Sequence, residues 1–190
     1  MSAPIVWTIH DMWPLTGGCH YSAECDRYTV GCHSCPALGS HARLDLARVT
    51  WLRKMRAWQD LPITVASPSN WLADCARRSV LFRDRPITVI PYGLDLDLYR
   101  PLDKAQSRLR FGLPLDASII LFRAVNATTD PRKGFDLLCQ ALRALPPTLP
   151  STPIEAVVFG GADSGIPTGL PIPIRNLGPV ADEAELAALY

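Results

Sequence analysis

The chain has 190 residues, of which 48% are hydrophobic, and its 19 basic and 18 acidic residues leave a net charge of +1. This composition is typical of a globular protein with enough apolar residues for one large domain or two small ones. The basic residues are not clustered along the sequence, so nucleic acid is not an expected partner. The longest apolar runs are far shorter than a membrane span, and the first residues lack the pattern of a signal peptide. We therefore expect a cytoplasmic protein with no transmembrane segment, whose thiols stay reduced.

The first predicted element is a strand over Ile5–Ile9, which is apolar on both faces like a central parallel strand. His10 and Asp11 follow it directly. Polar residues at the exit of such a strand lie where open α/β sheets bind ligands. His10 is therefore a candidate site residue, and the alternative is a histidine that is merely hydrogen-bonded at the start of a loop.

Residues 16–40 form a long loop without periodicity that carries four of the six cysteines. Loops of this length in compact domains are usually functional or held in place by something. Clustered cysteines in a reducing compartment favour a metal, and this spacing allows four thiolates around one tetrahedral ion. We expect a closed, structural zinc site with four ligands: Cys19, Cys25, Cys32 and Cys35. The alternatives left open are His20 or His33 in place of a thiolate, two disulfides, or a redox pair at the last two cysteines.

The chain then alternates helices and strands. The pattern predicts, in order, a helix over Leu44–Trp58, a strand over Ile63–Ala66, a helix over Asn70–Ser79 and a strand over Ile87–Ile90. Ser69 is a good N-cap for the second helix, and Pro91–Gly93 makes a turn after the last strand. A loop-rich stretch near Gly93–Arg100 then separates this group from a second one.

The second group is built around the stretch Ile119–Leu142. A strand of about five residues, Ser118–Phe122, is followed by a polar loop and by a helix from Phe135 whose apolar residues recur three or four apart. Arg132 and Lys133 precede that helix, where cations are unfavourable unless an anion binds at the same end. We therefore predict a phosphate site at Lys133.

The alternative for this stretch is a solvated surface on which Asp130 and Asp136 neutralise both cations. A further strand, Ile154–Phe159, ends in Gly160 and Gly161. Glycines at a strand exit let a ligand approach the backbone closely, and a simple tight turn is the other interpretation.

The remaining predicted elements are short. They are a helix over Lys104–Phe111 capped by Gly112, a strand over Ile172–Leu177, and a last helix that begins with a capping pattern at Asp182 and Glu185. Each group of strand, helix and strand resembles part of a doubly wound α/β domain.

Five segments carry a resemblance that covers nearly the whole chain: VWTIHDMWPLTGGCHYSAECDRYTVGCHSCPALGS, ASPSNWLADCARRS, TVIPYGLDLDLYRP, ILFRAVNATTDPRKGFDLL and LGPVADEAELAALY. In this order they resemble the group 1 (family 4) retaining glycosyltransferases of the GT-B fold, in particular bacterial sugar transferases of colanic-acid and other polysaccharide gene clusters.

The resemblance implies two partial Rossmann-like domains. Residues 1–95 would be the C-terminal part of the N-terminal, acceptor-side domain, and residues 96–190 the first part of the nucleotide-sugar donor domain. The family's glycine-rich first loop and paired-glutamate motif are absent, so the chain resembles a fragment. The implied activity is that of a hexosyltransferase in polysaccharide biosynthesis, which moves a sugar from a nucleotide diphosphate donor to a glycan or lipid-linked acceptor. Because a lipid-linked acceptor lies in a membrane, a peripheral association of the protein with a membrane is possible.

The resemblance also assigns roles to residues. Lys133 matches the lysine that binds the donor diphosphate, and Arg132 would help to bind it. His10 matches the histidine that reaches the transferred sugar. Gly160 and Gly161 are candidates for donor binding, and family members need no catalytic metal.

Two departures from the family pattern mark further positions. Tyr92 stands where many relatives have asparagine, and Arg123–Asn126 replaces a Gly-Arg pair that also binds diphosphate. The alternative functions are a non-catalytic, zinc-stapled α/β module and an inactive truncated remnant.

Overall fold

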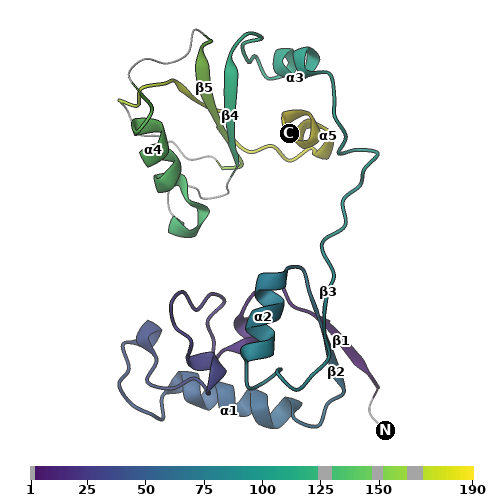
Figure 1. Cartoon of the computed structure of the whole chain (residues 1–190), viewed down its shortest axis with the longest axis vertical. Coiled ribbons are helices and arrows are strands. Elements are labelled where there is room, and N and C mark those ends of the chain that lie inside the picture. Colours follow the sequence, from purple (N-terminus) through teal and green to yellow (C-terminus); the bar gives the residue numbers. More distant parts are fainter. Residues whose placement is uncertain (1–2, 124–129, 147–151, 162–168) are drawn as a thin grey trace. The chain divides into compact units, whose positions relative to one another are not determined.

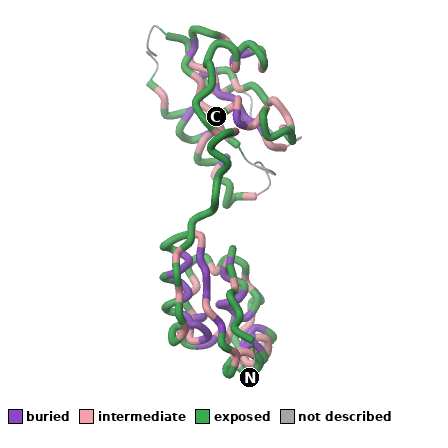
Figure 2. The backbone as a smooth tube through the Cα atoms, turned by 90° about the vertical axis from the view of Figure 1, so that its right-hand side faces the viewer, coloured by how far each residue is buried: buried purple, intermediate pink, exposed green. Residues whose placement is uncertain are grey.

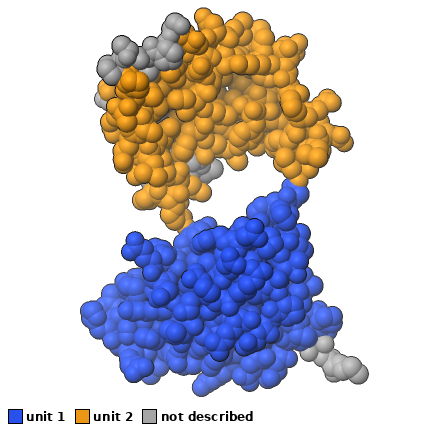
Figure 3. All heavy atoms as spheres, in the orientation of Figure 1, with its two compact units in different colours: residues 1–93 blue, residues 94–190 orange. Residues whose placement is uncertain are grey.

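The computed structural model describes residues 3–123, 130–146, 152–161 and 169–190. The chain forms two compact units, Met1–Gly93 and Leu94–Tyr190 (Figure 1), which Figure 3 shows in separate colours. In its described part, each unit contains one three-stranded parallel sheet, with helices between the strands of the first sheet and between β4 and β5 of the second. The predicted fold class, α/β with two partial Rossmann-like domains, is therefore confirmed.

The first unit follows the predicted alternation, with boundaries shifted by one or two residues. Its helices and strands are β1 (Ile5–Thr8), α1 (Leu46–Trp58), β2 (Ile63–Ser67), α2 (Asn70–Arg78) and β3 (Ile87–Val89). Between β1 and α1 the chain forms only three short 3₁₀ turns: Trp13–Leu15, Arg27–Thr29 and Pro36–Leu38. The expected N-cap of α2 is confirmed, because Leu72 N–H donates to Ser69 Oγ at 3.2 Å.

The position of β1 differs from the sequence-based expectation of a central strand. The strand order is β1-β2-β3, so β2 is central, and β1 pairs only with β2 among the described residues. Val6 is 72% exposed and Ile5 is 38% exposed. The expectation is wrong for the described sheet because an apolar run does not by itself show on how many sides a strand pairs.

The core of the first unit joins β2 to both helices. Buried Trp51, Val65 and Leu72 from these elements form one cluster with Phe82, which lies in the turn after α2. The Phe82 ring lies 6.0 Å from that of Trp7 and 5.8 Å from that of Trp58, and its side chain is fully buried. Figure 2 shows the buried stretches inside each unit and the exposed course of residues 90–97 between them.

The second unit contains the remaining elements. They are α3 (Lys104–Arg110), β4 (Ser118–Arg123), α4 (Phe135–Arg143), β5 (Ile154–Phe159), β6 (Ile174–Asn176) and α5 (Glu183–Leu189). The sheet order is β4-β5-β6, and the central strand β5 has its last four residues buried. Helix α4 packs on this sheet through Phe135 and Cys139, which cluster with Val158.

The predicted ends of two short helices in this unit are confirmed. Gly112, at φ +61°, follows α3 and donates its N–H to Leu109 O at 3.1 Å. Glu185 N–H donates to Asp182 Oδ1 at 2.8 Å at the start of α5. Among the described residues, no helix combines the length and apolar character needed to cross a bilayer.

The aromatic cluster gives a direct test of the first unit's core. All five tryptophans of the chain lie in this unit, so tryptophan fluorescence during urea unfolding reports on it alone. Replacing the buried Phe82 with alanine leaves a cavity, and we expect the free energy of unfolding to fall by about 3–5 kcal/mol. The control Leu44→Ala, at a side chain that is 72% exposed, changes it by no more than about 0.5 kcal/mol. Equal unfolding midpoints for Phe82→Ala and the wild type would contradict this packing.

Candidate functional site

Parallel pairing brings the carboxyl ends of the three strands of the first unit to one edge of the sheet. His10 follows β1 and Tyr92 follows β3, the two strands that flank β2. Their rings stack with centroids 5.7 Å apart at an interplanar angle of 6°, and His10 Nδ1 lies 2.6 Å from Tyr92 Oη. Two side chains 82 residues apart thus meet across the end of the central strand. Both are exposed, so a ligand can reach them.

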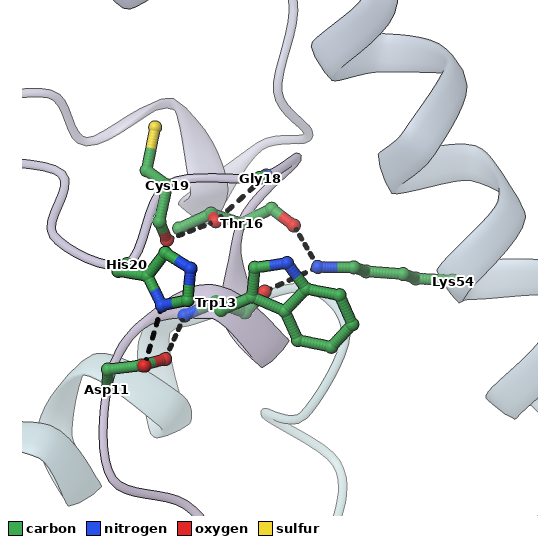
Figure 4. A network of polar contacts seen from close by, with 7 residues as sticks. All are labelled: Asp11, Trp13, Thr16, Gly18, Cys19, His20 and Lys54. Atoms are coloured by element: carbon green, nitrogen blue, oxygen red, sulfur yellow. Dashed lines mark hydrogen bonds and ion pairs between the residues drawn. The ribbon is translucent and has the colours of Figure 1, made fainter.

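Asp11 organises the chain just after His10. Its carboxylate accepts a hydrogen bond from Trp13 N–H at 2.7 Å and lies 2.8 Å from His20 Nδ1 (Figure 4). Burial alone would raise the pKa of Asp11, but the hydrogen bonds from His20 and Trp13 outweigh it and the pKa is lowered. The carboxylate therefore stays ionised and ties the exit of β1 to His20 near the start of the long loop.

Lys54 on α1 fixes the same loop from the opposite side. Its ammonium donates hydrogen bonds to the carbonyl oxygens of Trp13 and Thr16, and it lies 3.6 Å from the centroid of the Trp13 ring (Figure 4). The residue is only 5% exposed, and burial lowers its pKa to about 8, an effect that nearby Cys32, Asp11 and Cys19 oppose. The sequence gives no signal for this lysine, because a charged residue in an amphipathic helix normally faces solvent.

The four loop cysteines gather around one small cavity. Together with Gly17 and Tyr28 they line a space of about 20 Å³. All six cysteines of the chain, each within the described part, are free thiols. The described residues contain no group of three or more His, Cys, Asp or Glu side chains already positioned to hold a metal ion. The zinc expected from the spacing thus stays a prediction.

Two features of the thiols and backbone set this loop apart. Burial raises the pKa of Cys19 and of Cys32, and the neighbouring loop thiols act in the same direction. Ala23 and Ser34 have φ of +48° and +44°, and among described residues they are the non-glycine positions with positive φ. Such a conformation costs an L-residue roughly 1–2 kcal/mol, which the surrounding structure has to offset.

The second unit contains the predicted phosphate site. Lys133 ends a short 3₁₀ turn, Pro131–Lys133, and Gly134 at φ +72° connects the turn to α4. The ring of Phe135, the first residue of α4, lies 5.9 Å from that of Phe122 near the carboxyl end of β4. Lys133 therefore lies at the edge of the sheet where parallel α/β domains bind ligands.

The two adjacent cations differ in their partners. Arg132 forms a two-pronged pair with Asp130, with Nε to Oδ1 at 2.9 Å and Nη2 to Oδ2 at 2.7 Å. The hydrogen bonds from Arg132 lower the pKa of Asp130 to about 2, so the pair is ionised near neutral pH. Lys133 is exposed, and within the described ranges no carboxylate lies within ion-pair distance of its ammonium. Asp130 is therefore paired directly with Arg132, and the Lys133 charge acts on this carboxylate only through space.

The glycines after β5 lie at the same edge, because Phe159 at the end of β5 is in register with Arg123 at the end of β4. Gly160 has φ +103°, and its N–H donates to Gly178 O at 2.9 Å. A tight backbone conformation thus accounts for Gly160 without a ligand, and donor binding at Gly160 and Gly161 stays a prediction. Of the departure at 123–126, only Arg123 lies within the described residues.

Several known sugar transferases are similar in sequence to this chain. It is 29% identical over 97 residues to the putative colanic acid biosynthesis glycosyl transferase WcaC of Escherichia coli K12, a match that covers 48% of this chain and 24% of that protein. It is 37% identical over 117 residues to the D-inositol 3-phosphate glycosyltransferase of Frankia alni, covering 55% of this chain and 28% of the relative. The enzyme of that name from Xylanimonas cellulosilytica is 34% identical over 125 residues, covering 63% of this chain and 27% of the relative.

About half of the chain is homologous to family 4 glycosyltransferases. No family model matches the chain. It spans about a quarter of the length of these glycosyltransferases, with shares of 24%, 28% and 27%. Sugar transferases are thus the relatives of this chain, and the activity of a whole enzyme is a matter of proposal.

The contact between His10 and Tyr92 can be tested without any substrate. If the Tyr92 hydroxyl holds Nδ1, it favours one neutral tautomer of the imidazole, and Tyr92→Phe changes the tautomer ratio about two- to tenfold for one lost hydrogen bond. Nitrogen-15 NMR of the histidine rings measures this ratio, and the other three histidines serve as internal references. Tyr99→Phe in the second unit is the matched control. Identical His10 spectra in the wild type and in Tyr92→Phe would show that the contact is absent in solution.

Proposed function

We propose that this chain supplies parts of the acceptor-side and donor-side domains of a retaining glycosyltransferase in polysaccharide biosynthesis. The enzyme transfers a sugar from a nucleotide diphosphate donor to a glycan or lipid-linked acceptor. Support comes from the homology over about half of the chain and from two parallel sheets whose carboxyl ends carry polar residues. The relatives' names refer to colanic acid biosynthesis in one case and to D-inositol 3-phosphate in others, so we propose a class of acceptor and not a single compound.

The observation that carries the proposal is the environment of Lys133. A departing nucleoside diphosphate gathers negative charge in the transition state and needs fixed positive partners. Lys133 offers an ammonium at the start of α4, a nine-residue helix whose dipole points its positive end the same way. The exposed ammonium has no competing carboxylate in ion-pair range in the described part of the chain. Its charge is available to an incoming anion.

Arg132 has a supporting role in this proposal. Asp130 forms a bidentate ion pair with its guanidinium. The same carboxylate accepts a hydrogen bond from the Arg132 backbone N–H at 3.1 Å. This interaction stabilises the turn that presents Lys133, because one side chain closes both the ion pair and the start of the 3₁₀ turn. Arg132 thus positions its neighbour and occupies the hydrogen-bonding oxygens of Asp130.

His10 is the proposed residue of the first unit that meets the transferred sugar. A neutral imidazole whose Nδ1 is engaged by Tyr92 presents Nε2 as the free ring atom. If Nδ1 accepts the hydrogen bond of Tyr92, Nε2 carries the proton and donates to a sugar hydroxyl. The edge position beyond β1 leaves that atom open to ligands.

Nucleotide binding tests this proposal. We expect the 190-residue chain to bind uridine or guanosine diphosphate sugars. Lys133→Ala should weaken the binding about tenfold or more, since a charge-assisted contact contributes about 1.5–3 kcal/mol. Isothermal titration calorimetry measures both affinities.

Arg143→Ala is the matched control, because Arg143 is an exposed cation at the opposite end of α4. Its loss changes the net charge equally and should leave the affinity within about twofold, as expected for a charge remote from the ligand. Equal affinities of Lys133→Ala and the wild type would remove Lys133 from the site. Absence of nucleotide binding in a cooperatively folded wild-type chain would contradict the proposed donor domain.

A further inference from the structure

The loop between β1 and α1 brings four thiols to one place without a long secondary-structure element of its own. Cys19, Cys25, Cys32 and Cys35 line a cavity of about 20 Å³, enough for a single ion or water molecule. All four cysteines line this one cavity, and the two members of the later pair are only three residues apart in sequence. Four thiols around one ion-sized cavity form the donor set of a structural zinc site.

A backbone hydrogen bond holds one of these sulfurs in place. Gly17 N–H donates to Cys32 Sγ at 3.1 Å. Metal ligands are commonly held in orientation by hydrogen bonds of this kind. Gly17 has to be a glycine here, because a Cβ atom would lie 2.4 Å from Ala47 O on α1. The close packing of the loop against α1 thus places the Gly17 N–H within hydrogen-bond distance of Cys32 Sγ.

The two strained residues of the loop each lie within one pair of cysteines. Ala23, at φ +48°, lies between Cys19 and Cys25, and Ser34, at φ +44°, lies between Cys32 and Cys35. Both members of each pair line the cavity. Strain of this kind persists where a further interaction holds the segment, as at ligand clamps.

The nearby buried cation matches the charge of such a centre. Four thiolates and one Zn²⁺ carry a net charge of −2, which is unfavourable at a partly buried site unless a cation lies near. The Lys54 ammonium donates to the carbonyl oxygens of Trp13 and Thr16, and Thr16 also lines the cavity. A lysine buried with only backbone carbonyls as hydrogen-bond acceptors thereby obtains an anionic partner.

We propose that Cys19, Cys25, Cys32 and Cys35 bind one Zn²⁺ that holds this loop in place. Binding releases the four thiol protons to solvent and forms four zinc–sulfur bonds, with no change in oxidation state. In the described part of the chain the thiols are not yet in ligand positions, so binding requires them to move closer together. The ion would fix the segment that begins at His10 and Asp11. The proposal is independent of the glycosyltransferase assignment.

Metal analysis of the purified chain tests the proposal. We expect one zinc per chain by mass spectrometry after expression with added Zn²⁺ and purification under reducing conditions. Removal of zinc with a chelator should lower the melting temperature measured by tryptophan fluorescence, which reports on the first unit. Serine substitution at any one of the four cysteines should weaken Zn²⁺ binding at least tenfold in competition with a chromophoric chelator. The control Cys139→Ser, on α4 in the second unit, should keep the wild-type affinity.

Cobalt substitution of the wild type covers the case in which serine variants fail to fold. Co²⁺ held by four thiolates gives intense visible bands and a thiolate-to-cobalt charge-transfer band, whereas octahedral Co²⁺ gives weak ones. The proposal is overturned if the folded protein holds no zinc and all four loop thiols react freely with a thiol reagent. It is overturned equally by a mass that shows two disulfides in the loop, by an octahedral cobalt spectrum, or by full zinc retention in a loop variant.

Discussion

Parallel strand pairing is the constraint on which the rest of the structure depends. It places the carboxyl ends of β1 and β3 at one edge of the first sheet, and those of β4 and β5 at one edge of the second. His10 and Tyr92 meet only because of the first arrangement, since 82 residues separate them in the sequence. The second brings the start of α4 and the glycines after β5 to a common edge. In each unit the candidate chemistry thus lies where the fold class binds ligands.

Local charge pairing then decides which cation is available. Asp130 binds Arg132 in a bidentate ion pair and leaves Lys133 exposed beside it. Lys54 on α1 is the opposite case, because its ammonium is buried against the Trp13 ring and the carbonyl oxygen of Thr16. An exposed lysine at a helix start suits a transient anionic ligand, whereas a buried one stabilises structure. The two lysines therefore have different roles despite the same chemistry.

Periodicity and capping residues are enough to predict the strands and helices to within a few residues. Ser69, Gly112 and Asp182 mark helix ends through local hydrogen bonds, which depend on neighbouring residues alone. Properties set by distant partners are not predictable in this way. The edge position of β1 depends on which strands pair, and the contact between His10 and Tyr92 depends on strand order. The buried state of Lys54 depends on where the loop folds over α1, since its hydrogen bond to the Thr16 carbonyl spans 38 residues of sequence.

The central claim is that the carboxyl edge of the second sheet binds the diphosphate of a sugar nucleotide. Hydrogen–deuterium exchange of the whole chain, with and without saturating uridine diphosphate, tests it most directly because backbone amides report the location of binding. The account predicts slower exchange in peptides that contain Asp130–Phe135 and Phe159–Gly161. Slower exchange confined to the opposite edge of that sheet, or an unchanged pattern despite measured binding, would contradict it.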